Sequence, residues 1–325
     1  MRTPGARPGL ADVQAAAARL AGLAWRTPLL PSPALSEATR ASVWLKLETV
    51  QSTGSFKMRG AANALVRLRE RGFEGVVVTA SAGNHGLALS TAARQLGFQV
   101  RVHLPATAPA AKKHALAGLG AEAIEASSYD EAEARAHDDA TQPGCHYLSP
   151  YNDFDVIAGA GTVALEMFDE RADLDALIVP VGGGGLLSGS SVVARALRST
   201  DVLIVGTETA ASPVYTSALG AGRPVTVEVR ETLADGLAGN MDADNLAFPM
   251  IRDLVDRVVK VDEASIARAM RRLILDDRLV AEGAAATAIA ALDQLDLKGR
   301  RVGIVLTGRN VDGHVIQKII SGSRL

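Results

Sequence analysis

Short runs of aliphatic and β-branched residues alternate along the chain with longer amphipathic stretches. This alternation predicts strands at 42–47, 76–79, 99–104, 121–125, 177–181, 202–205, 258–261 and 302–306, and helices at 85–96, 110–119, 129–140, 186–197 and 282–292. An Ala-rich helix is expected over 12–23 with Asp12 as its cap, and Asp262 is expected to cap a helix after strand 258–261. Strands that alternate with helices indicate βαβ units and parallel sheets, whose ligands lie at the carboxyl ends of the strands.

A run of four glycines, Gly182, Gly183, Gly184 and Gly185, separates a predicted strand from a predicted helix. Backbone amides without Cβ atoms can close around an anion, and the helix N-terminus favours negative charge. The spacing does not fit a dinucleotide fingerprint, and no Gly-Lys-Ser/Thr follows, so a nicotinamide oxidoreductase is disfavoured and a nucleoside triphosphate loop is excluded. The alternative is a tight turn without a ligand.

Two further loops follow predicted strands. Ser81, Ala82, Gly83, Asn84 and His85 offer a hydroxyl, an amide and backbone donors at a helix start, which suits a carboxylate. The alternative is ordinary capping by Ser81.

In the second of these loops, Thr307 follows strand 302–306 and would point a neutral hydroxyl toward a ligand, unless it is only a turn residue.

Lys57 lies in an unusual context, because it follows a Thr-Gly-Ser turn and the aromatic Phe56. Most lysines are solvated surface charges. A lysine at a partly desolvated helix start would instead have a lowered pKa, which favours imine formation.

Composition narrows the possible partners. The 325 residues allow one large or two modest domains, and a net charge of -2 gives no attraction to nucleic acid or an anionic membrane. The single cysteine, Cys145, rules out a disulfide framework, and the absence of a secretory signal or a membrane-length apolar run makes a cytoplasmic setting the simplest expectation. The scattered histidines show no metal-ligand spacing, so no metal site is predicted.

The lysine, the glycine loop and the asparagine loop together resemble the fold-type II pyridoxal-5′-phosphate (PLP) enzymes, which are tryptophan synthase β-like, and within them the serine/threonine dehydratase and serine racemase group. The similarity runs from Arg26-Thr27-Pro28-Leu29 to Asn310-Val311-Asp312 and includes the segments 55–61, 81–86, 157–162, 182–186 and 234–236. It implies an α/β fold with two α/β domains and mostly parallel sheets, PLP as cofactor and a homodimer. We expect a discontinuous large PLP-binding domain (1–72 and 150–325) and a small mobile domain (73–149).

The resemblance also implies roles for individual residues. Lys57 would hold PLP as a Schiff base and move the Cα proton of the substrate. Glu282 would face the edge of the cofactor ring, unless it only favours a helix N-terminus. The other implied contacts are Phe56 near the ring, Asn84 on its phenolic oxygen, Gly182, Gly183, Gly184 and Gly185 on the phosphate, Thr307 on the pyridine nitrogen, and Ser81, Ala82, Gly83, Asn84 and His85 around the substrate carboxylate.

The reaction implied by the resemblance is β-elimination of water from L-threonine, L-serine or a related β-hydroxy-α-amino acid, giving a 2-oxo acid and ammonia. Thr-Gly-Arg-Asn at 307–310 is similar to the hydroxyectoine-utilisation dehydratase branch, and Arg309 could pair with a second substrate carboxylate or be solvated at the rim. The alternatives are a β-replacement synthase of the cysteine synthase type, a serine racemase-like enzyme and a catalytically inactive binding protein. Ala82 stands where racemases of the group have serine, so little racemase activity is expected. A cation near Glu208 is doubtful, because Val214 stands where a second carboxylate is expected.

Overall fold

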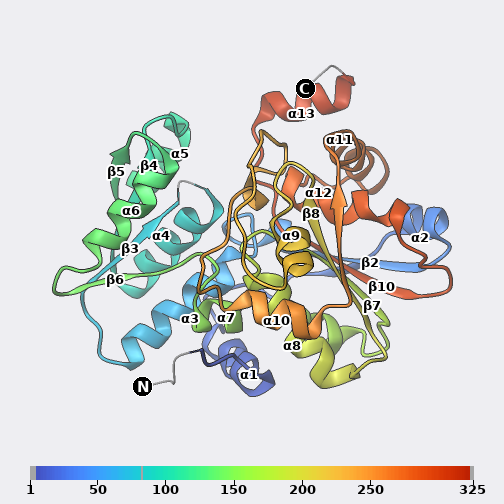
Figure 1. Cartoon of the computed structure of the whole chain (residues 1–325), viewed down its shortest axis with the longest axis horizontal. Coiled ribbons are helices and arrows are strands. Elements are labelled where there is room, and N and C mark those ends of the chain that lie inside the picture. Colours follow the sequence, from blue (N-terminus) through green and yellow to red (C-terminus); the bar gives the residue numbers. More distant parts are fainter. Residues whose placement is uncertain (1–4, 82, 323–325) are drawn as a thin grey trace.

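The computed structural model describes residues 5–81 and 83–322. Its strands form two separate sheets that lie on opposite sides of the molecule (Figure 1). Within the described ranges, every helix is too short or too polar to cross a lipid bilayer.

The larger sheet has six strands in the order β1-β2-β10-β7-β8-β9. Their bounds are β1 Leu29–Pro31, β2 Ser42–Leu47, β7 Ala176–Pro180, β8 Leu203–Thr209, β9 Arg257–Val261 and β10 Arg301–Leu306. All neighbours pair in parallel except β1, which runs antiparallel to β2. Every residue of β7 is buried, as expected for a parallel strand covered by helices on both faces.

The smaller sheet has four parallel strands in the order β5-β4-β3-β6. These strands are β3 Val76–Ala80, β4 Gln99–Pro105, β5 Glu122–Ala126 and β6 Cys145–Tyr147. All of them come from one continuous stretch of chain, while strands before and after that stretch build the larger sheet.

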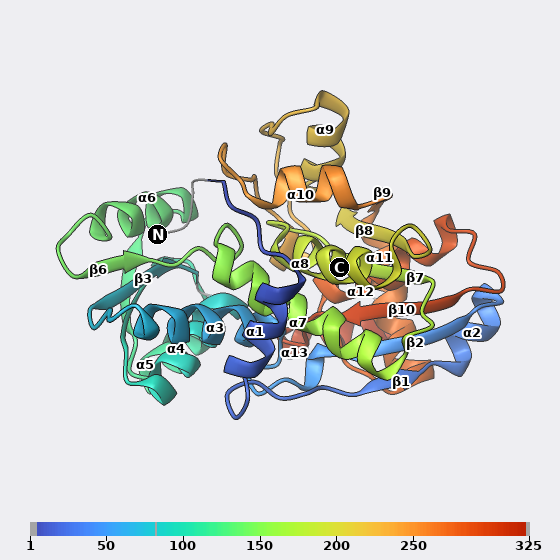
Figure 2. The same ribbon diagram turned by 90° about the horizontal axis from the view of Figure 1, so that it is seen from below.

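Helices cover both faces of the larger sheet (Figures 1 and 2). The helices of the described residues are α1 Leu10–Arg19, α2 Pro33–Thr39, α3 Lys57–Glu70, α4 Asn84–Leu96, α5 Ala110–Gly118, α6 Tyr129–Asp139, α7 Phe154–Glu170, α8 Gly185–Arg198, α9 Val214–Ala221, α10 Ala247–Leu254, α11 Glu263–Arg272, α12 Gly283–Ala290 and α13 Gly313–Ser321. Of these, α4, α5 and α6 lie against the smaller sheet. Short 3-10 turns η1 (Glu48–Val50), η2 (Asp235–Leu237) and η4 (Ala291–Gln294) and a π-helical turn, η3 (Leu273–Asp277), connect some of these elements.

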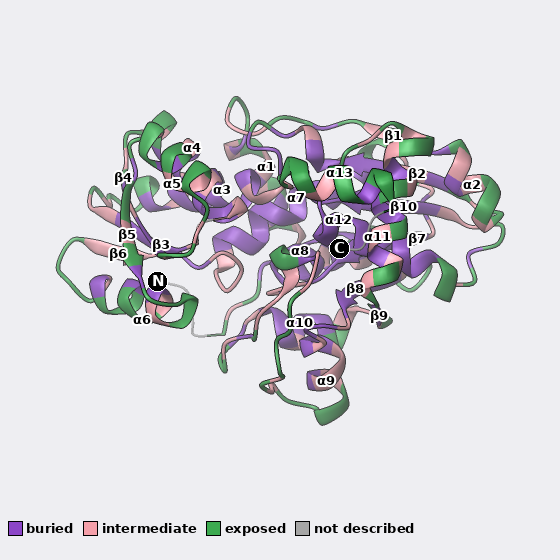
Figure 3. Cartoon of the chain, turned by 90° about the horizontal axis from the view of Figure 1, so that it is seen from above, coloured by how far each residue is buried: buried purple, intermediate pink, exposed green. Residues whose placement is uncertain are grey.

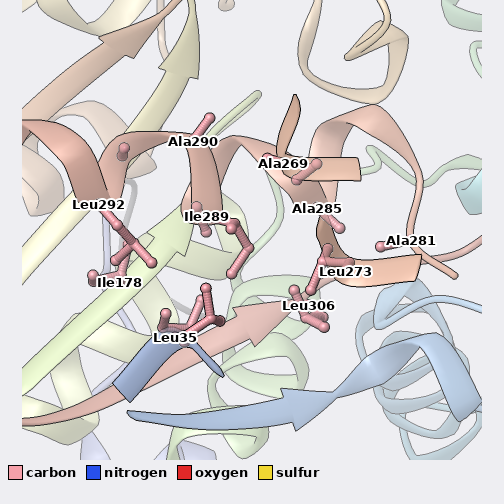
Figure 4. Close-up of a cluster of buried hydrophobic side chains, with 14 of the residues drawn as sticks. Leu35, Ile178, Ala269, Leu273, Ala281, Ala285, Ile289, Ala290, Leu292 and Leu306 are labelled. Carbon is pink, nitrogen blue, oxygen red and sulfur yellow. The ribbon is translucent and has the colours of Figure 1, made fainter. Parts of the chain in front are cut away.

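The core has two layers around the larger sheet (Figure 3). Successive residues of β7 point to opposite faces, so Ile178 packs with α11 and α12 while Leu177 and Val179 pack with α7 and α8. Figure 4 shows the first of these clusters, in which Ile178 lies near Ile289 of α12. The smaller sheet packs with α3 and α4 in its own buried cluster.

The alternation of strands and helices predicted the order of the central elements correctly. The Ala-rich helix was placed two residues too late, because α1 begins at Leu10 with Gly9 as N-cap. Asp12 is therefore not the cap; it lies in the first turn and accepts a hydrogen bond from the Gly9 amide at 2.9 Å. Asp262 does cap α11, since its carboxylate accepts from the Ser265 amide at 2.7 Å.

Candidate active site

Lys57 is the half-buried first residue of α3. Its Nζ donates to the carbonyl oxygen of Pro150 at 2.8 Å. Burial lowers the pKa of Lys57 to about 8, and the negative charge of Glu282 partly opposes this effect. The lysine therefore has a substantial neutral fraction near neutral pH, which a nucleophilic amine requires.

Tyr151 connects the lysine to the glycine loop. A Cβ added at Gly183 would lie 2.1 Å from Cγ of the Tyr151 ring, and one at Gly185 would lie 3.1 Å from the Tyr151 carbonyl oxygen. Pro150, which accepts from Lys57, is the neighbouring residue, and consecutive Cα atoms are only about 3.8 Å apart. The amine and the loop thus lie on either side of one dipeptide.

The glycine loop has the features of an anion site. Gly184 adopts a φ of 94°, which favours glycine, and is the N-cap of the 14-residue helix α8. Tyr215 and Asn245 donate to the Gly183 carbonyl oxygen at 2.9 and 3.3 Å, which orients that peptide. No described residue accepts a hydrogen bond from the amides of 182–185. These free donors at a helix N-terminus fit a phosphate group.

Asn84 joins the two sides of the molecule through a chain of side-chain hydrogen bonds. Its amide nitrogen donates to both carboxylate oxygens of Glu282, at 2.8 and 3.1 Å. Its amide oxygen accepts from Asn310 at 2.6 Å, and Asn310 also donates to the Thr53 carbonyl oxygen at 2.9 Å. The position of Asn84 beside the cleft is therefore fixed by groups that precede α12 and follow β10.

Glu282 is the N-cap residue of α12, but its side chain makes no capping hydrogen bond. It is buried and points to Asn84 instead. Burial raises the pKa of Glu282 to about 7, with the Asn84 hydrogen bond acting in the opposite direction. The alternative that it only serves a helix terminus does not account for these contacts.

The loop after β3 is arranged around Ser81. Gly83, rather than Ser81, is the N-cap of α4, so the alternative that Ser81 only caps this helix is wrong. The Ser81 hydroxyl instead accepts from the Gly83 amide at 3.3 Å. Burial, together with the charge of Lys57, lowers the pKa of the adjacent His85 to about 3, so its imidazole is neutral. Ala82, the remaining predicted residue of this loop, lies outside the described residues.

Thr307 follows β10 directly and is buried. Its carbonyl oxygen accepts from the Phe56 amide at 3.0 Å, which brings the residue before Lys57 to the end of β10. The buried Ser55 hydroxyl beside them has no hydrogen-bond partner among the described residues. Free donors on one side and an unsatisfied hydroxyl on the other show that the residues present fit a polar, phosphorylated ligand such as PLP.

Arg309 is exposed, and its backbone amide donates to the Gly54 carbonyl oxygen at 2.9 Å. It borders a groove of about 510 Å³ that also includes Thr53 and Leu87. A second cavity, of about 550 Å³, is bounded by Glu282, Asn310 and Lys112 among others. The polar chain through Asn84 therefore lies between two openings to solvent.

Sequence reasoning did not find Pro150 and Tyr151, which join the lysine to the glycine loop. Neither residue belongs to a recognisable motif. Pro150 acts through its backbone carbonyl oxygen, and Tyr151 acts through the packing of its ring against Gly183. It also left out the role of Asn310 in holding Asn84. The signal that could have found Asn310 is its place just after β10, beside Thr307.

Glu208 has a structural role at the start of α9. Its carboxylate accepts from the amides of Tyr215 and Thr216, both at 2.9 Å, at the start of α9. Across residues 5–81 and 83–322, no group of three or more His, Cys, Asp or Glu side chains is arranged to hold a metal ion.

The Lys57 amine, which can form an imine, and the glycine loop at 182–185, which can bind an anion, both contact the dipeptide Pro150-Tyr151. A ligand that carries both an aldehyde and a phosphate requires two such groups close together. The class of protein defined by this fold and site is a PLP enzyme with an α/β fold built on two mostly parallel sheets. Residues 20–308 match the family described as pyridoxal-phosphate dependent enzyme, and the chain belongs to that family.

Known relatives cover nearly the whole chain. It is 40% identical to an L-threonine ammonia-lyase of Thermotoga maritima, over 96% of this chain and 78% of that protein. It is 38% identical to an L-threo-3-hydroxyaspartate ammonia-lyase of a Pseudomonas species, over 96% of this chain and 98% of that protein. The crystal structure of serine racemase from Dictyostelium discoideum superposes with a TM-score of 0.87 at 34% identity, covering 94% of this chain and 100% of that one.

Proposed function

We propose that the protein is a PLP-dependent lyase that eliminates water from a β-hydroxy-α-amino acid, such as L-threonine or L-serine, to give a 2-oxo acid and ammonia. The observation that carries this proposal is the half-buried Lys57, whose Nζ contacts the Pro150 carbonyl next to the glycine loop. The relatives from Thermotoga maritima and Pseudomonas, both ammonia-lyases, support the same reaction class.

PLP supplies an electron sink for the bond electrons at the substrate Cα, and protein groups select the outcome. In the proposed arrangement, the amides of 182–185 would hold the phosphate and Lys57 would hold the aldehyde end. Phe56 would lie beside the ring, and Asn84 would hydrogen-bond the phenolic oxygen. The substrate carboxylate would be received by Ser81, Ala82, Gly83, Asn84 and His85.

Lys57 has two tasks in this proposal. It would hold PLP through its amine, and when that amine is free it would take the proton from the substrate Cα. A pKa lowered to about 8 suits both tasks, because the neutral form is the base and the nucleophile. The Pro150 carbonyl accepts a hydrogen bond from Nζ and so holds the amine beside the dipeptide that contacts the glycine loop.

Thr307 would favour elimination over transamination. A carboxylate beside the pyridine nitrogen of PLP would keep that nitrogen protonated, whereas the hydroxyl of Thr307 would leave it neutral. PLP would then stabilise negative charge at the substrate Cα less strongly, which would favour rapid loss of a β-hydroxyl group.

Water is excluded by closure of a small domain, 73–149, over a large domain, 1–72 and 150–325. Support comes from the separate four-stranded sheet within that small segment and from the contact of Asn84 with Glu282 across the two parts. We also propose a homodimer and a cytoplasmic setting. Size-exclusion chromatography with light scattering tests the first, and fractionation of the cells that make the protein tests the second.

A serine racemase-like activity is the second candidate, because a Dictyostelium discoideum relative of that name is 36% identical over 96% of this chain. Serine in place of Ala82 would be needed to donate a proton from the face opposite Lys57. With alanine there, we expect little D-serine from L-serine.

The test follows the products of the purified PLP-loaded enzyme. We expect 2-oxo acid and ammonia in equal amounts from at least one of L-threonine, L-serine and L-threo-3-hydroxyaspartate, with no product from Lys57→Ala. Substantial D-serine would favour the racemase, and product that forms only with added sulfide would favour a β-replacement synthase. No turnover of any of these substrates would refute the lyase assignment.

A further inference from the structure

Helix α7 contacts two helices through glycine pairs. At the α3–α7 crossing, a Cβ added at Gly159 would lie 2.9 Å from the Cα of Gly60 and 2.5 Å from the Arg59 carbonyl oxygen. At the α7–α8 crossing, a Cβ added at Gly189 would lie 2.8 Å from the Gly161 amide nitrogen. The three backbones therefore come into direct contact at these glycines, and Figure 2 shows α3, α7 and α8 gathered together.

Backbone conformation does not explain these glycines. Gly60, Gly159, Gly161 and Gly189 all have helical, negative φ values. Alanine would stabilise such positions by roughly 0.5–1 kcal/mol if space allowed. Here each added Cβ would meet a backbone atom within 3 Å that cannot rotate aside, and at Gly60 and Gly161 a methyl group of Val156 or Val13 lies at 2.9 Å as well. By contrast, a Cβ at Gly220 in α9 would meet nothing within 4 Å.

The helices that meet at these crossings carry the two halves of the proposed cofactor site. α3 begins at Lys57, and Gly60 follows it by about 4.5 Å of helix. α8 begins at Gly185, and Gly189 follows it by about 6 Å of helix. Each crossing thus lies about one turn from the group that would contact PLP.

A buried ion-pair network fastens α3 to α7 at a second point. The Arg59 guanidinium, 2% exposed, donates to Glu166 of α7 at 2.6 and 2.9 Å and to Glu48 of η1 at two distances of 2.8 Å. Lys46 of β2 donates to Glu166 at 2.7 Å. Two cations balance two anions, and such buried networks contribute little net stability compared with apolar packing. Fixing the orientation of α3 is the better account of this network.

We propose that α7 is a spacer that sets the separation between Lys57 and the glycine loop, so that one PLP molecule can bond at both ends. Gly159 and Gly161 are its positioning residues. This inference rests on the proposed cofactor arrangement. Two contacts made by one rigid ligand reinforce each other only when their spacing matches the ligand, so a small change in helix separation reduces the affinity for PLP while each contact remains possible.

The test separates the two ends of the cofactor. Pyridoxal has the aldehyde but no phosphate, and pyridoxamine 5′-phosphate has the phosphate but no aldehyde. For Gly159→Ala and Gly161→Ala, we expect the dissociation constants of these two probes to change by less than about 2-fold and that of PLP to rise at least about tenfold. Gly220→Ala is the matched control and is expected to bind all three as the parent does.

Unchanged affinity for PLP in the folded glycine variants would overturn the proposal that α7 is a spacer. An equal loss of affinity for PLP, pyridoxal and pyridoxamine 5′-phosphate would also overturn it, because that result would show that the whole site is disturbed rather than the distance between its two ends. If the alanine variants do not fold, Glu166→Gln loosens the same helix pair without a clash, and a PLP-selective loss is again expected; equal weakening of all three ligands, or none, contradicts the proposal. A parent protein that never forms an imine with PLP would instead refute the proposed function.

Discussion

Glu282 allows a quantitative test of the site because its carboxyl is buried among neutral donors. Burial raises its pKa from 4.5 to about 7. The folded state therefore binds this proton more tightly than the unfolded chain does. The stabilisation from this group is fully present below about pH 4.5 and is lost as the pH rises to about 7. At about 1.4 kcal/mol for each pKa unit, the loss amounts to about 3 kcal/mol.

Glu282→Gln removes this pH dependence and keeps the shape. The glutamine oxygen can still accept from Asn84, and the loss of one of two hydrogen bonds costs about 1 kcal/mol at any pH. Relative to the parent, the variant should therefore gain about 3 kcal/mol in free energy of unfolding between about pH 4 and about pH 8.

The assay is urea denaturation of both proteins, freed of PLP, at these two pH values. Glu37→Gln, an exposed acid on α2, is the matched control and should show no such gain. The account of a buried proton is wrong if the difference in free energy of unfolding between Glu282→Gln and the parent is the same at both pH values. It is also wrong if the variant becomes less stable relative to the parent at the higher pH.

Three further predictions concern neighbouring groups. In Gly184→Ala, the new Cβ would lie 2.1 Å from the Tyr215 hydroxyl at a φ of 94°, so titration with pyridoxamine 5′-phosphate should show at least about tenfold weaker binding; parent-like affinity would refute the anion cup. Glu208→Gln should reduce stability by about 1–2 kcal/mol in chemical denaturation, because the start of α9 loses an acceptor, while the absorbance of bound PLP stays unchanged; altered absorbance would show that Glu208 acts on the cofactor. The rate at which Lys57 forms its imine with added PLP, followed by stopped-flow absorbance, should rise with pH and level off above about 8, since only the neutral amine reacts; a rate independent of pH would contradict the lowered pKa.

The sequence was informative where one local pattern decides the structure. β7 and β10 are nearly continuous aliphatic runs, and such runs occur mainly in parallel strands buried on both faces. The four glycines at 182–185, which lead from β7 into the first residue of α8, predicted an anion loop because they carry no side chains of their own. The boundaries of α1 were harder, because alanine favours helix everywhere and the start is set by Gly9.

Contacts between distant segments could not be read from local patterns. Asn84 and Glu282 are 198 residues apart, and their pairing depends on how the two sheets are placed. Pro150 contributes only a carbonyl oxygen to Lys57, which any residue type could supply. The glycines of α7 appear unfavourable in a helix until the neighbouring backbones are known.

The most direct test of the central claim is to locate the residue that bonds to the cofactor. The PLP-loaded protein is reduced with borohydride, which fixes an imine as a stable amine, and its peptides are then analysed by mass spectrometry. We predict the phosphopyridoxyl group on Lys57 and its absence from Lys57→Ala. Label on another lysine, or none on the loaded protein, would contradict the account.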